Sequence, residues 1–201
     1  MPSPRRLVLG STSRYRRELL QRLHLPFEVH SPQVDEAPRP AERPAQLALR
    51  LAEEKAREVA RRFPAAVVIG ADQVADLDGL MVGKPGSHDR ARQQLQTLRG
   101  RRVVFQTAVA VTCEATGYAE SRLASVVVRF RDLSDDEIEY YLRTEQPYDC
   151  AGSAKCETLG IALLESIESD DPTALVGLPL IRTCEMLRAA GIDMLRPGPA
   201  P

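Results

Sequence analysis

The segment from Val67 to Val74 constrains the fold more than any other part of the chain. It begins with an apolar run, Val-Val-Ile-Gly-Ala, that no charged residue interrupts. Such a run is typical of a strand that is covered on both faces. Helix and strand patterns alternate through the first part of the chain, and hairpin signals follow. We therefore expect an α/β fold with a mixed, twisted sheet, flanking helices and two lobes around a central groove.

Local signals predict the boundaries of the elements. Ser13, Ser87 and Ser134 are suitable N-caps before helical patterns, and Asp78-Gly79 between two apolar stretches is a strong hairpin signal. We expect one two-lobed domain over residues 1–195, followed by a Pro-rich, disordered tail at 196–201. The expected strands lie near 7–9, 27–31, 67–74, 80–82, 103–111, 123–131 and 160–168, and the expected helices near 14–23, 45–62, 88–98, 135–143 and 179–190.

Composition excludes several classes of function. The 201 residues carry a net charge of −1, whereas proteins that bind nucleic acid or membrane surfaces usually have a basic excess. No apolar run approaches the length of a membrane span, and the basic N-terminus lacks the apolar core of a signal peptide. The four cysteines lack C-x-x-C spacing, which argues against a zinc site and favours reduced thiols. We expect a cytoplasmic protein without nucleic-acid or membrane partners.

The first predicted strand leads into a turn at residues 10–13, Gly-Ser-Thr-Ser, and then into a helix. Free backbone N–H groups at a helix start attract anions, and three hydroxyls and three arginines (Arg14, Arg16 and Arg17) accompany them here. Arginines in a first turn oppose the helix dipole, so they indicate either a phosphate site or an ordinary basic surface. This segment alone leaves both alternatives open.

Two further residues lie where chemistry is expected. Lys55 falls on the apolar stripe of the predicted 45–62 helix, so its ammonium either extends to the edge of the core or emerges in a pocket. Asp72 stands at the end of a buried strand, where α/β proteins commonly bind ligands. A carboxylate there needs a cationic or metal partner. We favour a functional role for Asp72 over that of a simple turn residue.

The chain thus offers three cations and two carboxylates that suit the cleavage of a phosphoanhydride. The cations neutralise developing charge, while carboxylates hold a divalent metal and orient or deprotonate the attacking water. No Cys/His or Ser/His/Asp pattern competes with this interpretation. The residues concerned are Arg16, Lys55, Lys84, Glu36 and Asp72.

Several separate motifs, in order from Leu7 to about Leu195, resemble the Maf family of nucleoside triphosphate pyrophosphatases. The resemblance implies metal-dependent cleavage of a nucleoside triphosphate to the monophosphate and pyrophosphate. It also implies a two-lobed α/β fold related to the inosine triphosphatase type, and a homodimer. The motifs are Ser11-Thr-Ser-Arg-Tyr-Arg-Arg17, Asp35-Glu36, Glu54-Lys55, Gly70-Ala-Asp-Gln73 and Gly83-Lys84-Pro85.

Within that family, three positions resemble the branch that cleaves 7-methyl-GTP. The chain has Tyr15, Gln73 and Glu157 where the dTTP/UTP branch typically has Arg, Thr and Gln. Two residues depart from the pattern, because Tyr15 replaces the usual Trp and Arg14 replaces the usual Pro. N7-methylation makes guanine cationic, which favours stacking on an aromatic ring, and Glu157 could accept hydrogen bonds from the guanine edge.

The resemblance therefore implies a Mg²⁺- or Mn²⁺-dependent 7-methyl-GTP pyrophosphatase. Alternatives are a dTTP/UTP pyrophosphatase of the same family and a nucleotide-binding regulator of cell division without turnover. Arg14 and Arg17 are expected at the surface. The implied catalytic residues are Asp72, Glu36, Lys55 and Lys84, with Glu36 and Asp72 as metal ligands, and the implied substrate-binding residues are Ser11, Ser13, Arg16, Tyr15, Gln73 and Glu157.

Overall fold

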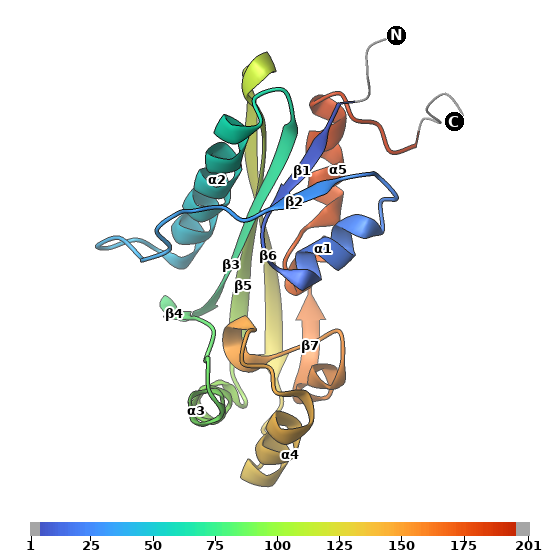
Figure 1. Cartoon of the computed structure of the whole chain (residues 1–201). Coiled ribbons are helices and arrows are strands. Elements are labelled where there is room, and N and C mark those ends of the chain that lie inside the picture. The colour runs from blue at the N-terminus through green and yellow to red at the C-terminus, as the bar shows by residue number, and fades with distance from the viewer. Residues whose placement is uncertain (1–4, 196–201) are drawn as a thin grey trace.

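The computed structural model describes residues 5–195, whose strands form one mixed sheet through the length of the molecule (Figure 1). The order is β2-β1-β3-β5-β6-β7, and β4 pairs with the end of β3. The strands are β1 (Leu7–Gly10), β2 (Glu28–His30), β3 (Val67–Leu77), β4 (Leu80–Val82), β5 (Arg102–Cys113), β6 (Tyr118–Phe130) and β7 (Leu164–Glu168). The α-helices are α1 (Arg14–Gln21), α2 (Pro44–Arg62), α3 (His88–Leu98), α4 (Asp135–Glu145) and α5 (Leu180–Ala189).

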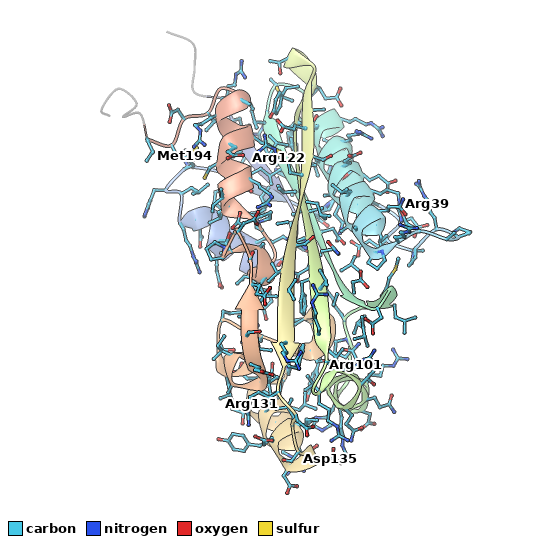
Figure 2. All side chains as sticks on the ribbon, turned by 180° about the vertical axis from the view of Figure 1, so that it is seen from behind. Arg39, Arg101, Arg122, Arg131, Asp135 and Met194 are labelled. Carbon is cyan, nitrogen blue, oxygen red and sulfur yellow. The ribbon has the colours of Figure 1, made fainter. Side chains whose placement is uncertain are left out.

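The long strands β3, β5 and β6 connect two lobes. The first lobe contains β1, β2, α1, α2 and α5, and the second contains β4, β7, α3 and α4 (Figure 1). Strand β1 pairs in parallel with the start of β3, whereas β4 pairs with its last three residues. Figure 2 shows the reverse side, where Arg122 lies in the first lobe and Arg101, Arg131 and Asp135 lie in the second.

Helices cover both faces of the sheet in the first lobe, as the apolar run in β3 predicted. Val68 packs on the side of α2, whereas Ile69 packs on the side of α1 and α5. Gly70 is needed between β3 and α2, because a Cβ atom there would lie 2.3 Å from the Ala52 carbonyl oxygen. This close approach brings α2 and its Lys55 against β3. In the second lobe, a separate core forms among α3, α4 and the ends of the long strands.

The mixed α/β fold with flanking helices and two lobes is confirmed, and most of the predicted elements are present. One part of the prediction is wrong: residues 160–163 are not a strand, because a 3₁₀ helix, η3 (Leu159–Leu163), precedes β7. The Leu159 N–H donates to Glu145, and Gly160 lies so near the Lys155 backbone that a Cβ atom would not fit. Strand β6 also begins earlier than predicted, at Tyr118.

Other predictions concern the extent of the chain. The predicted tail, 196–201, lies outside the described residues. The division into a single two-lobed domain over 1–195 stays a prediction. Within residues 5–195, none of the helices combines the length and the apolar character that crossing a membrane requires.

Candidate active site

A cavity of about 720 Å³ lies between the two lobes. Residues from the β1–α1 loop, α2 and β3 line it on one side, and residues of β4 and the 149–157 segment line it on the other. All ten residues that the sequence indicated for substrate binding or catalysis lie on its wall: Ser11, Ser13, Tyr15, Arg16, Glu36, Lys55, Asp72, Gln73, Lys84 and Glu157.

Lys55 lies at the centre of the charged part of this cavity. Its side chain is almost fully buried, and its Nζ lies 2.6 Å from Glu36 Oε1 and 2.7 Å from Asp72 Oδ1. The ammonium therefore emerges in the pocket, which decides between the two alternatives left open by the sequence. Because Asp72 is only 8% exposed, this ion pair supplies the partner that a buried carboxylate requires.

The charges around Glu36 keep it ionised. Partial burial raises the pKa of its carboxyl group, but the contact with Lys55 and the charges of Lys84 and Arg16 outweigh burial and lower the pKa overall. The carboxylates of Glu36 and Asp72 thus face three cations in one cavity. Such a surplus of positive charge suits an anionic ligand.

Arg16 reaches the cavity from the first turn of α1. Its Nε donates to the Gly177 carbonyl oxygen over 2.9 Å, and its Nη1 lies 3.5 Å from Ser11 Oγ. Burial lowers the pKa of the Arg16 guanidinium, while the charges of Asp72 and Glu36 oppose this effect. The guanidinium is thus oriented by protein contacts before any ligand binds.

The two serines of the turn have different roles in holding it. Ser13 is the N-cap of α1, since its Oγ accepts from the Arg16 N–H over 3.4 Å. Ser11 is buried, and its Oγ accepts from the Ser13 N–H over 3.1 Å. The predicted helix start is confirmed, and its hydroxyls shape the turn that carries Arg16.

Tyr15 lies on the part of the cavity wall that adjoins the 149–157 segment, which we call the base end of the cavity. Its hydroxyl accepts a 2.7 Å hydrogen bond from Arg14 Nη2 and donates to Asp149 Oδ1 over 3.4 Å. The Cys150 thiol lies 3.6 Å from the same hydroxyl. Burial raises the pKa of Tyr15, so the phenol stays neutral. An aromatic ring, Asp149 and the exposed carboxylate of Glu157 therefore line this end of the cavity.

Sequence reasoning missed two contributors to this end. Arg14 is exposed, as predicted, but it also lines the cavity, with its guanidinium carbon 4.7 Å from the centre of the Tyr15 ring. It is therefore more than a surface residue. Asp149 gave no signal, because a single acid in a polar loop is usually solvated. Its position directly before the segment Cys150-Ala-Gly-Ser153, which also resembles the 7-methyl-GTP branch, is the available clue.

Gln73 lines the cavity, but its amide N–H groups point toward protein atoms. Nε2 lies within hydrogen-bond distance of Thr107 Oγ1, Ala174 O and Leu175 O, at 2.9, 3.1 and 3.0 Å. The donors are therefore already used, which leaves the amide oxygen as the group that could face a base. The predicted selection of the base by Gln73 stays a prediction.

The residues present fit a divalent metal that is shared with a substrate. Mg²⁺ is commonly held by one or two carboxylates together with substrate phosphates, and Glu36 and Asp72 supply hard oxygen donors within reach of one ammonium. Among residues 5–195, no group of three or more His, Cys, Asp and Glu residues is arranged to hold a metal. The donor set therefore suits Mg²⁺ or Mn²⁺ bound jointly with a polyphosphate, and not a site closed by protein ligands.

The cysteines take no part in a disulfide, as expected for reduced thiols. Burial raises the pKa of the Cys150 thiol to about 11 and that of Cys156 to about 12. Burial therefore favours the protonated form of both thiols near neutral pH, and a thiol is a weaker nucleophile than a thiolate.

Comparison with known proteins shows the family to which the chain belongs. The chain is similar to a protein named 7-methyl-GTP pyrophosphatase from a Polaromonas strain, with 71% identity over 96% of this chain and 88% of that protein. Proteins of the same name from Albidiferax ferrireducens and Burkholderia pseudomallei are 66% and 57% identical, over 96% and 98% of this chain and 98% and 94% of theirs.

The solved structure of the Staphylococcus aureus Ham1 protein covers 64% of this chain and 73% of its own, with 15% identity and a TM-score of 0.48. This likeness is weak, so the fold class depends on the sheet order and helix packing described above. The sequence profile of the family described as Maf-like protein matches residues 6–190. The chain therefore belongs to the Maf family.

Proposed function

We propose that the protein hydrolyses 7-methyl-GTP to 7-methyl-GMP and pyrophosphate. The observation that carries the proposal is the Lys55 ammonium between Glu36 and Asp72 on the wall of a cavity of nucleotide size. The name shared by relatives up to 71% identical supports the choice of substrate. The same relationship favours this activity over dTTP/UTP hydrolysis and over binding without turnover.

At the phosphate end, water attacks the α-phosphorus and the bond to the bridging oxygen of pyrophosphate breaks. The Lys55 ammonium donates a hydrogen bond to Oδ1 of Asp72. We therefore assign Oδ2 as the base that accepts the proton of the attacking water. Lys84 and Arg16 neutralise the charge that develops on the leaving pyrophosphate. Ser11 and Ser13 hold the turn from which Arg16 extends.

We assign Glu36 and Asp72 to a Mg²⁺ or Mn²⁺ ion that binds together with the triphosphate. When bound, such an ion neutralises phosphate charge and makes the phosphorus more susceptible to attack. The carboxylates of Glu36 and Asp72 are held in place for this role by Lys55, which contacts one oxygen of each.

At the base end, the Tyr15 ring offers a stacking surface to the cationic 7-methylguanine. The carboxylates of Asp149 and Glu157 favour a positively charged base electrostatically, and Glu157 can also accept hydrogen bonds from its N1–H and amine. Unmethylated GTP offers the same hydrogen bonds without the positive charge. Selectivity for the methylated base therefore depends on charge and stacking.

A substrate panel tests the proposal. Pyrophosphate release is measured with 7-methyl-GTP, GTP, dTTP and UTP, each with Mg²⁺, with Mn²⁺ and after chelation of metal. We expect the highest kcat/KM with 7-methyl-GTP in the presence of metal. Equal rates on all four nucleotides would refute the specificity, a preference for dTTP and UTP would favour the other branch, and binding without product would favour the regulator.

Asp72→Asn tests the assignment of the base. We expect kcat to fall by about 100-fold or more while the variant remains folded, because the amide cannot accept the proton. Retained turnover would remove Asp72 from this role. Circular dichroism and the thermal midpoint provide the check on folding.

We also propose that the enzyme acts in the cytoplasm as a homodimer, on a small-molecule nucleotide and without nucleic-acid or membrane partners. The net charge of −1 supports the absence of nucleic-acid and membrane partners, and the family resemblance supports the homodimer and the nucleotide substrate. Light scattering at micromolar concentration tests the dimer directly.

A further inference from the structure

We infer that Gln73 and Thr107 are positioning residues, which hold the 3₁₀ turn η4 (Ala174–Val176) and through it orient Arg16 in the cavity. The inference deepens the proposed function, on which it rests for the assignment of Arg16 to the triphosphate. Gln73 then affects the binding of the phosphates, through Arg16, and not the recognition of the base.

The first link joins the sheet to the turn. Gln73 and Thr107 are register partners on the neighbouring strands β3 and β5, so their side chains lie on the same face. The Thr107 hydroxyl is fully buried, accepts from Gln73 Nε2 over 2.9 Å and donates to the Ala174 carbonyl oxygen over 2.9 Å. Gln73 Nε2 also lies 3.1 and 3.0 Å from the carbonyl oxygens of Ala174 and Leu175, so its two N–H groups are shared among three acceptors. Two side chains thus fix two successive carbonyl groups of η4.

The second link joins the turn to Arg16. The Gly177 N–H donates to the Ala174 carbonyl oxygen over 3.0 Å, which places Gly177 directly on the fixed end of the turn. The Gly177 carbonyl oxygen then accepts from Arg16 Nε over 2.9 Å. A bond at Nε fixes the plane of a guanidinium and leaves its terminal N–H groups for an anion. Gly177 also lies against the Arg16 side chain, with a φ of +120° that favours glycine.

The far side of the same loop is anchored independently. Asp171 is fully buried, and its Oδ1 accepts from the Thr173 hydroxyl over 2.7 Å while its Oδ2 accepts from the Ile181 N–H over 2.9 Å. This anchor ties the loop to the start of α5 and involves no contact with Arg16. Loss of the Gln73–Thr107 contacts therefore removes the side-chain bonds to the carbonyl groups of η4, while the Asp171 anchor and the bond between Thr173 and the Leu178 carbonyl oxygen stay in place.

Thr107→Val is the test, because it removes the hydroxyl with little change in volume and Thr107 does not line the cavity. Thr107→Ser is the matched control, since it keeps the hydroxyl. KM and kcat are measured with 7-methyl-GTP and GTP. We expect Thr107→Val to raise KM by about fivefold for both nucleotides alike and Thr107→Ser to behave like the parent protein.

A double-mutant cycle with Arg16→Ala distinguishes positioning from a general structural effect. If Thr107 acts through Arg16, Thr107→Val should raise KM by less than about twofold in the Arg16→Ala background. An equal increase in KM in both backgrounds would overturn the inference. An increase in KM confined to 7-methyl-GTP would also overturn it, because it would indicate that Gln73 contacts the base.

Calorimetric binding of inorganic tripolyphosphate, with Mg²⁺, gives a readout that depends neither on the base nor on turnover. We expect the same loss of affinity in Thr107→Val, and Gln73→Leu serves as a second variant if Thr107→Val does not fold. Weakened binding with no hydrolysis of any nucleotide would refute the proposed function and support the positioning role. Unchanged binding in an active enzyme would refute the positioning role alone.

Discussion

The guanidinium of Arg14 covers the ring of Tyr15, with its central carbon 4.7 Å from the ring centre, and donates to the hydroxyl of the same tyrosine. A cation therefore already occupies the neighbourhood of the ring that we assign to a cationic base. The hydrogen bond to Tyr15 is the main cause of the raised pKa of the Arg14 guanidinium, and the negative charge of Asp149 is a smaller cause.

Arg14→Ala should therefore increase the preference for 7-methyl-GTP over GTP. Removal of the arginine removes a like charge from the base end and uncovers aromatic surface, and both effects favour the methylated base. We expect the ratio of kcat/KM for the two nucleotides to rise by about threefold or more. Arg14→Lys, which keeps the charge, is the control. A lower ratio in Arg14→Ala would mean that Arg14 supports the stacked base.

Lys55→Met should abolish most of the turnover. It leaves the buried Asp72 without its cation and removes one positive charge from the phosphate end. We expect kcat/KM to fall by about 100-fold. The matched control is Arg57→Met on the exposed side of the same helix, where the ion pair with Glu53 is at the surface and the expected change is about twofold or less. Similar losses in both variants would contradict the role of Lys55.

The pH dependence of stability should report the lowered pKa of Glu36. A carboxyl group whose pKa is lower in the folded state contributes stability above its unfolded value, about 4.3, and loses this contribution as the pH falls through the folded pKa. The free energy of unfolding of the parent protein should thus exceed that of Glu36→Gln at pH 7, and the two should converge toward pH 3. Urea denaturation across this range measures the difference. A difference that grows toward acid pH would have the wrong sign.

Glu36→Gln should also weaken the binding of metal with substrate. One of the two assigned carboxylate ligands is lost, so the Mn²⁺ concentration needed for half-maximal binding in the presence of pyrophosphate should rise by about tenfold. Electron paramagnetic resonance of free Mn²⁺ measures this without turnover. Asp35→Asn is the neighbouring control, since Asp35 does not line the cavity. An unchanged Mn²⁺ requirement in Glu36→Gln would remove Glu36 from the metal site.

Gly70→Ala should destabilise the protein by about 2 kcal/mol or more, because the added methyl group would collide with the backbone of α2. The same collision should move Lys55 relative to Asp72 and lower kcat. Thermal denaturation and kinetics measure the two effects together. A variant of normal stability would show that α2 can move away from β3 without cost.

The sequence predicts those parts of the site that depend on local pattern. The N-cap at Ser13 follows from a few neighbouring residues. The prediction that Asp72 stands at the end of its strand is wrong, because β3 continues to Leu77 and pairs there with β4 and β5. The pairing of Lys55 with Asp72 does not follow from local pattern. Helical periodicity places Lys55 on the apolar stripe, but it does not determine the position of the ammonium group. Only the close packing at Gly70 decides that the ammonium meets the strand.

Two other features depend on contacts between distant segments. Thr107 in a strand resembles any β-branched core residue, and its hydroxyl acquires a role only when η4 folds over it. Residues 160–163 contain the apolar residues of a strand, but the bond from Leu159 to Glu145 and the close approach of Gly160 to Lys155 produce a 3₁₀ helix. Local propensity is overridden there by tertiary packing.

The passage of β3, β5 and β6 through both lobes has a consequence for how a nucleotide enters. Because these three strands are paired in both lobes, the lobes can change their relative position only by bending or twisting the shared sheet. Asp72 lies within the paired part of β3, and the same strand leads through the β4 hairpin toward Lys84. One continuous strand and its hairpin thus set how far Asp72 lies from the loop that carries Lys84, so a change in the bend of the sheet would alter the groove while this spacing along the chain stays the same.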